Sequence, residues 1–402
     1  MEVEKKIAEI HWKKNTFLFI LSQAITLLGS SVVQMAIIWQ VTVTTSSGLW
    51  VTLLTLSAMI PQAIVSVIGG AYADRYSKKK IIILADLGIA LVTLLLVILL
   101  LVEKTTYLLP VLLIVSAIRS IASGIQTPTV HAVIPLIVPE KYLLQYNSIT
   151  SSLMATIQFV APAIAGSMLF IGQFQWILLI DVITALIGVF FLSFVNIKQR
   201  TTESNQEESV IKSIKSGIVF AKKTKNVRNL LLTFAGFIFF SVPSGFLSVL
   251  LIQRTFGENY FYLTVNEMLG FAGMVLGGLL LGVWGGFKRR KTTLVIGLVS
   301  YGLLSFFLSF TTVFWLFATL MFFLSCSIPV IQSVVTTGLQ ESVPLNKQGR
   351  IFGVFGMIYN AIMPLGMLLF GPLADVVTIQ WMIAPSGVML IFLALFVWEK
   401  TD

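Results

Sequence analysis

The sequence predicts an all-α membrane protein with twelve transmembrane helices, six on each side of a basic linker. Its 402 residues are 57% hydrophobic and only 11% charged, with a mean hydropathy of +0.94, whereas soluble domains carry roughly 25% charged residues. Apolar runs long enough to cross the ~30 Å hydrocarbon core as helices recur along the chain. Basic residues gather in alternate gaps between these runs, which is typical of loops on the cytoplasmic face.

The apolar runs define the expected spans, which cover residues 16–43, 49–71, 81–102, 107–127, 149–171, 174–195, 229–252, 263–286, 292–311, 313–338, 351–374 and 379–398. An even number of spans returns both termini to one face. All but three of the 27 Lys and Arg residues belong to that face, because only Lys104 and Arg254 fall outside it and Arg119 lies within a span. We therefore expect both termini in the cytoplasm. The first run is too long for a signal peptide, so we expect it to be retained.

The linker divides the chain into three parts: an amino-terminal six-helix bundle at 1–195, a cytoplasmic linker at 196–228, and a carboxy-terminal six-helix bundle at 229–402. The polar segment 201–208 favours a solvated linker. The segment 210–223 has a second interpretation, an amphipathic helix lying on anionic lipid.

A charged stretch, GGAYADRYSKKK at residues 69–80, separates the second and third spans. It resembles the loop 2-3 signature of the major facilitator superfamily, Gly-x-Leu-Ala-Asp-Arg-x-Gly-Arg-Lys. The match holds at Gly70, Ala73, Asp74, Arg75 and Lys79, and it fails at Tyr72, Ser77 and Lys78. The resemblance implies a gating role for Gly70, Asp74, Arg75 and Lys79, with Arg350 at the start of span eleven as the implied partner.

An internal repeat supports two pseudo-symmetric halves. Residues 282–291 repeat the glycine, the aromatic residue and the basic end of residues 70–79, without the acid, and Val343-Pro344 repeats Val138-Pro139. The resemblance to the superfamily implies two six-helix bundles with a substrate site between them near mid-membrane.

Two spans place polar residues on one helical face. The face of the first span comprises Gln23, Thr26, Ser30 and Gln34, and that of the fourth includes Ser116, Arg119 and Ser123. In the superfamily the first helix lines a cavity, so we expect these residues, with Gln332 of span ten, to contact substrate. The alternative is hydrogen bonding between helices.

Arg119 needs a partner, because a bare guanidinium at mid-membrane costs at least ~2.5–3.5 kcal/mol. Its placement resembles a span-four motif of the superfamily, although Ala122 and Ser123 replace the usual Gln and Gly. The acids available inside the spans are Asp86, Asp181 and Glu267. We expect these four ionisable residues to be candidates for proton coupling, and a structural ion pair is the alternative. Asp86 has Arg75, Lys80 and Arg119 as candidate partners.

Span five contains APAIAG at residues 161–166, which resembles the antiporter motif Gly-Pro-x-x-Gly-Gly at Pro162 and Gly166. The resemblance implies export, and a simple proline kink is the alternative. No Gly-Lys dipeptide occurs, so a phosphate-binding loop is absent and an ion gradient is the expected power source. We expect no cofactor and no metal site, with His11 and His131 in loops.

The closest resemblance within the superfamily is to bacterial macrolide efflux proteins of the drug:proton antiporter type. It rests on the phrases at 33–38, 85–87, 118–121, 136–140 and 349–352. We therefore expect a monomeric transporter of the bacterial inner membrane, and not an enzyme, which exports a bulky hydrophobic or amphiphilic drug in exchange for protons. The net charge of +10 follows from loop topology and does not indicate nucleic-acid binding.

Two alternatives stay open. One is an exporter or carrier of an endogenous metabolite, a siderophore or a lysolipid. The other is a membrane partner of an ATP-driven protein, or a sensor.

Overall fold

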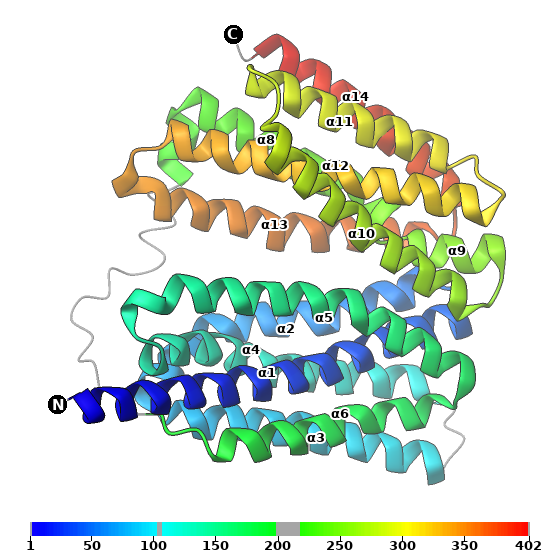
Figure 1. The fold of residues 1–402 in the computed structure, drawn as a ribbon. Coiled ribbons are helices and arrows are strands. Elements are labelled where there is room, and N and C mark those ends of the chain that lie inside the picture. Colours follow the sequence, from blue (N-terminus) through cyan, green and yellow to red (C-terminus); the bar gives the residue numbers. More distant parts are fainter. Residues whose placement is uncertain (1, 103–106, 198–217, 401–402) are drawn as a thin grey trace. The chain divides into compact units, whose positions relative to one another are not determined.

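The computed structural model describes residues 2–102, 107–197 and 218–400, and every regular element in them is helical (Figure 1). Side chains are described throughout these ranges except at residues 2–11, 67–75, 345, 346 and 400. The chain forms two compact units. Unit 1 comprises Met1–Val41 and Leu53–Glu203, and unit 2 comprises Thr42–Thr52 and Ser204–Asp402. The first two helices therefore each contribute residues to both units.

Unit 1 is built from the first six long helices. They are α1 (Glu2–Thr45), α2 (Gly48–Arg75), α3 (Lys78–Val102), α4 (Leu108–Ile137), α5 (Leu143–Ile171) and α6 (Phe174–Ser193), with a short 3₁₀ turn, η1 (Glu140–Tyr142), before α5. The helix α3 packs on both α4 and α6. These three helices therefore bring their polar residues together.

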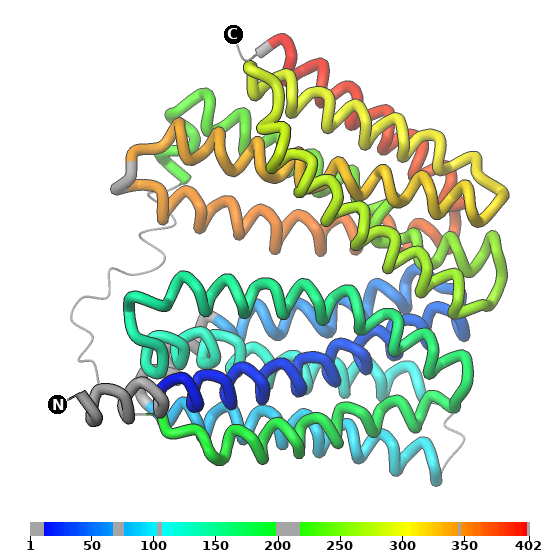
Figure 2. The backbone as a smooth tube through the Cα atoms, viewed as in Figure 1, coloured from blue at the N-terminus to red at the C-terminus, as the bar shows by residue number. Residues whose placement is uncertain are grey.

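Unit 2 contains seven labelled helices. They are α8 (Lys225–Gly245), α9 (Ser248–Phe256), α10 (Tyr260–Trp284), α11 (Arg290–Leu308), α12 (Phe314–Ser342), α13 (Leu345–Leu373) and α14 (Gln380–Lys400). The helix α10 packs along α12, and α8 packs against α13 and α14. The helices α11 and α14 run side by side, as Figure 2 also shows.

Glycines allow the closest helix crossings. A Cβ added to Gly302 of α11 would lie 2.6 Å from the carbonyl oxygen of Gly387 in α14, and one added to Gly387 would lie 2.5 Å from that of Gly302. A Cβ at Gly277 of α10 would lie 2.2 Å from the carbonyl oxygen of Cys326 in α12. Small residues at such contacts are typical of packing between membrane helices, where van der Waals contact replaces the hydrophobic effect.

The predicted number of spans is confirmed, since twelve helical segments of the described chain are long and apolar enough to cross a membrane. The seventh differs from the prediction, because α8 and α9 are separate helices. Pro243 and Gly245 stand at the break, and the amides of Phe246 and Leu247 both donate to the carbonyl oxygen of Val242. Proline lacks a backbone donor, and glycine is a weak helix former.

The loop between spans four and five is shorter than predicted. It was expected from residue 128 to residue 148, but α4 continues to Ile137 and α5 begins at Leu143. The helix α4 continues through Pro128 and Pro135, and proline is tolerated within membrane helices. The loop placement of both histidines was also wrong, because His11 lies in α1 and His131 in α4.

Candidate functional site

A buried ion pair lies at the centre of the polar residues of unit 1. The Arg119 guanidinium, on α4, donates to the Asp181 carboxylate, on α6, and to the Thr93 hydroxyl, on α3. Arg119 is 5% exposed and Asp181 only 1%. The pair is thus removed from water, and its stability depends on the groups around it.

Hydroxyl groups from two more helices complete the coordination of Asp181. The Thr93 hydroxyl donates to Asp181 Oδ2 at 3.0 Å, and the Ser30 hydroxyl, on α1, donates to Oδ1 at 2.8 Å. Both carboxylate oxygens therefore have partners. This is what a buried charge requires, because an unsatisfied charged oxygen would cost several kcal/mol.

A second buried carboxylate, Asp86, lies two turns from Thr93 on the same face of α3. The Gln126 side chain of α4 donates to Asp86 Oδ1 at 2.7 Å. Asp86 is 4% exposed, and its Oδ2 atom has no hydrogen-bond partner among the described residues. The buried hydroxyl of Ser116, one turn before Arg119 on α4, also has no such partner in the described chain.

The spacing of these residues follows from an antiparallel helix pair. On α3 the polar positions are 86 and 93, and on α4 they are 119 and 126, two turns apart in each case. Consecutive spans run in opposite directions, so Asp86 meets Gln126 at one level and Thr93 meets Arg119 at the other. Sequence reasoning did not single out Thr93 and Gln126. The matched seven-residue spacing of polar residues in two consecutive spans was the signal that would have found them.

The partner of Arg119 is therefore Asp181. Of the three candidate partners of Asp86, Arg119 pairs with Asp181, and Asp86 accepts from Gln126. Lys80 is exposed and the side chain of Arg75 lies outside the described residues.

The predicted cavity residues of α1 lie in two environments. Thr26 is buried and packs on Gly188 of α6, and Ser30 is bonded to Asp181, so these two make contacts between helices. Gln23 and Gln34 are half-buried. Their role in a substrate cavity stays a prediction.

The remaining candidates are dispersed. Ser123 is half-buried on α4, and Pro162 and Gly166 are buried in α5. In unit 2, Glu267 is half-buried on α10, where no described residue bonds its carboxylate, and Gln332 is exposed on α12.

The predicted gating residues are only partly described. The side chains of Gly70, Asp74 and Arg75 lie outside the described residues. Lys79 Nζ donates to the carbonyl oxygens of Ser193 at 2.6 Å and Val195 at 2.9 Å, and so satisfies the end of α6. Arg350 is half-buried on α13. Their gating role stays a prediction.

The residue after Arg119 ties α4 to α2. The hydroxyl of Ser120 accepts from the amide of Gln62 at 2.8 Å and donates to the carbonyl oxygen of Ala58 at 2.6 Å. These two backbone groups would otherwise bond each other within α2. Ser120 is thus inserted into the hydrogen-bond ladder of α2 next to Pro61, an arrangement that bends helices.

The two buried acids of the site differ in their surroundings. Asp181 is paired with the Arg119 guanidinium, whereas Asp86 has no ion pair among the described side chains and accepts from the Gln126 amide. Both acids are buried. Ionisable groups inside a membrane are costly and are therefore functional-site candidates.

Comparison with known proteins gives consistent results. Residues 10–401 match the family described as transmembrane secretion effector. The chain is 28% identical to Macrolide efflux protein A of Streptococcus pyogenes over 390 residues, which cover 96% of this chain and 95% of that protein. It is 28% identical to Macrolide efflux protein A of Enterococcus faecalis over 319 residues, which cover 78% of this chain and 98% of that protein. The fold is similar to that of a nucleoside transporter NupG variant, with a TM-score of 0.74, 14% identity, and coverage of 97% of this chain and 100% of that one.

Proposed function

This chain belongs to the transmembrane secretion effector family of the major facilitator superfamily, and we propose that it exports a macrolide-type antibiotic in exchange for protons. It is a multi-pass membrane transporter. The macrolide is proposed from the two efflux relatives, both of which carry that substrate class in their names. The proposed cycle rocks the bundles 1–195 and 229–402 against each other, with both termini in the cytoplasm.

The observation that carries the proton coupling is the Arg119–Asp181 pair with Asp86 beside it. Two hydroxyl donors and a guanidinium surround the oxygens of Asp181, an arrangement that stabilises a carboxylate. Protonation of Asp181 releases Arg119 inside a dry bundle, and a bare guanidinium there is unfavourable. A change of proton occupancy therefore forces rearrangement of α4 against α6.

Asp86 supplies a route for that proton. Asp86 is the other buried acid of the site formed by α3, α4 and α6, and its Oδ2 atom has no hydrogen-bond partner among the described residues. It can accept a proton without loss of an ion pair, since its bond is to the Gln126 amide. We assign Asp86 the uptake or release of the proton and Asp181 the conformational response.

The driving force is adequate for one proton per substrate. A proton that descends ~100 mV releases ~2.3 kcal/mol, and one pH unit adds ~1.4 kcal/mol. Because 1.4 kcal/mol corresponds to a tenfold ratio, these terms sustain a substrate gradient of two to three decades.

The test is uptake of a radiolabelled macrolide into everted membrane vesicles with an imposed pH gradient, acidic inside. We expect uptake that collapses when the gradient is dissipated. Asp86→Asn and Asp181→Asn should each abolish this gradient-dependent uptake. Glu341→Gln serves as the matched control, because Glu341 is an exposed carboxylate that pairs with Arg290 and is not part of the buried site.

The outcomes separate the two parts of the proposal. Gradient-dependent uptake that survives in Asp86→Asn and Asp181→Asn would refute the assigned coupling residues. Absence of macrolide uptake, with other hydrophobic drugs accumulated in a gradient-dependent way, would refute the substrate class but not the coupling.

A further inference from the structure

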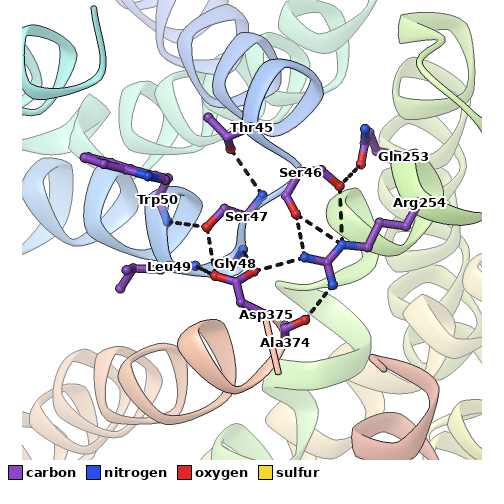
Figure 3. A network of polar contacts seen from close by, with 10 residues as sticks. All are labelled: Thr45, Ser46, Ser47, Gly48, Leu49, Trp50, Gln253, Arg254, Ala374 and Asp375. Atoms are coloured by element: carbon purple, nitrogen blue, oxygen red, sulfur yellow. Dashed lines mark hydrogen bonds and ion pairs between the residues drawn. The ribbon is translucent and has the colours of Figure 1, made fainter. Parts of the chain in front are cut away.

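A second polar network lies in unit 2, at the ends of the first, seventh and eleventh spans (Figure 3). We call it the Arg254–Asp375 network, and its members are Ser46, Ser47, Gly48, Leu49, Gln253, Arg254, Ala374 and Asp375. All three spans are odd-numbered. Because consecutive spans cross the membrane in opposite directions, the carboxy-terminal ends of these three lie on the face opposite the termini of the chain. The network thus gathers segments that are distant in sequence.

Asp375 caps the beginning of α2 from a different part of the chain. Its Oδ1 atom accepts from the Gly48 amide at 2.7 Å, and its Oδ2 atom accepts from the Leu49 amide at 2.9 Å and the Ser47 hydroxyl at 2.8 Å. The first amides of a helix have no partner within the helix, and the helix dipole favours an anion there. Partial burial raises the pKa of Asp375, but these bonds and that from Arg254 outweigh it, so the pKa lies below its ordinary value.

Arg254 holds the same turn from a second side. It donates to the carbonyl oxygens of Ser46 and Ala374, and it pairs with Asp375 Oδ1 at 3.0 Å. Ser46 also donates from its hydroxyl to Gln253 at 2.6 Å. Its φ of 49° is left-handed, a conformation that is unfavourable for a non-glycine residue and persists only when its surroundings impose it.

Backbone contact reinforces these bonds. A Cβ added to Gly48 would lie 2.1 Å from the carbonyl oxygen of Gly371 in α13, and one added to Gly371 would lie 1.7 Å from the Thr52 hydroxyl. Thr52 is fully buried. The first turn of α2 is therefore fitted against the end of α13 without intervening side chains.

This turn belongs to unit 2, although the rest of α1 and α2 belongs to unit 1. We propose that the Arg254–Asp375 network is a releasable latch, which holds residues 42–52 on unit 2 in one stage of transport and lets them go in another. Transporters of this architecture work by movement of one bundle against the other. Two helices that are anchored in both units oppose such movement until one anchor opens.

The Arg254–Asp375 network consists of bonds that can break and form again. Its bonds join charged side chains to backbone groups and hydroxyls that water can also satisfy, and both Arg254 and Asp375 are 29% exposed. Water can therefore replace each bond when the turn leaves. The buried Arg119–Asp181 pair offers no such exchange, so the two polar networks have different roles.

The latch can be tested without a substrate. Thr52→Cys, in a Cys326→Ala background, places the single thiol of the protein beneath the latched turn. We expect slow reaction with a maleimide in detergent micelles, and reaction about tenfold faster after Asp375→Asn, the ratio for loss of ~1.4 kcal/mol. Arg254→Gln should act in the same direction, and Glu341→Gln should leave the rate unchanged.

A second thiol distinguishes release of the turn from general unfolding. Ser305 is fully buried on α11, a helix that contributes no residue to the network, so Ser305→Cys should stay unreactive in the Asp375→Asn protein. Equal maleimide rates at Thr52→Cys with and without Asp375→Asn would overturn the proposal. An equal acceleration at both thiols would also overturn it.

A covalent lock tests whether release is needed for transport. We expect the Ser47→Cys, Asp375→Cys variant, in the Cys326→Ala background, to lose macrolide uptake when its two thiols are oxidised to a disulfide and to regain it on reduction; this test rests on the proposed function. Macrolide uptake that is measurable in the reduced protein and unchanged after oxidation would contradict a latch that must open, whereas absence of uptake in wild type would refute only the proposed function.

Discussion

Replacement of Asp181 by asparagine isolates the energetic role of the buried pair. Asp181→Asn leaves the Arg119 guanidinium, which is 5% exposed, without its anion. Removal of one partner of a buried pair typically costs 3–5 kcal/mol, because the remaining charge is neither solvated nor paired. Against a typical total stability of about 5–15 kcal/mol this loss is large.

The double variant Arg119→Gln, Asp181→Asn should be more stable than Asp181→Asn alone. It removes both charges and keeps side chains that bond to the hydroxyls of Thr93 and Ser30. Its cost should be about 1–2 kcal/mol, the range for loss of hydrogen bonds. The double variant should therefore be about 2–3 kcal/mol more stable than Asp181→Asn, so the costs of the two single substitutions should not add.

Unfolding free energies measured by titration with SDS in mixed micelles, with tryptophan fluorescence as the signal, complete this double-mutant cycle. The same cycle on Arg290 and Glu341 is the control, because that pair is more than half exposed and should couple by only about 0.2–1 kcal/mol. If the Arg119 and Asp181 substitutions add to within about 0.5 kcal/mol, the two side chains are independent and the argument fails.

Three further predictions concern stability and use the same titration. The pKa of Asp375 lies below the ordinary 3.8. Its contribution to the free energy of unfolding should therefore be complete above that pH and lost as pH falls through the folded-state pKa, so the unfolding free energies of wild type and Asp375→Asn should become equal at low pH. Gly302→Ala should destabilise by about 1–3 kcal/mol through overpacking, whereas Gly282→Ala, with nothing within 4 Å, should not. Lys79→Met should cost about 1 kcal/mol because it frees the Ser193 carbonyl, and Lys79→Arg should recover part of it.

Hydropathy alone was sufficient to predict the twelve spans, because lipid requires each crossing to be a long apolar helix. Span boundaries were less predictable. Span four was expected to end at residue 127, but α4 continues through Pro128 and Pro135 to Ile137, because proline is tolerated within membrane helices. The break in the seventh span was visible only as Pro243 and Gly245, two residues that many membrane helices tolerate.

The chemistry of the candidate site was predictable, but its pairing was not. Arg119, Asp86 and Asp181 stood out as charges in apolar runs. The choice of Asp181 as partner depends on how α4 is rotated against α6, which the sequence does not specify. Asp375 gave no such signal, because an acid in a polar loop is ordinary. Its importance arises from the amides of Gly48 and Leu49, which come from a distant turn.

Arg119 and Ser120 are consecutive on α4, and consecutive helical positions point about 100° apart. One therefore faces the Asp181 carboxylate of α6 while the other occupies the gap in the α2 ladder between Ala58 and Gln62. Any sliding of α4 along its axis must displace both contacts by the same amount. Movement of α4 along its axis would therefore change the bend of α2 and the distance between the charges of Arg119 and Asp181 at the same time.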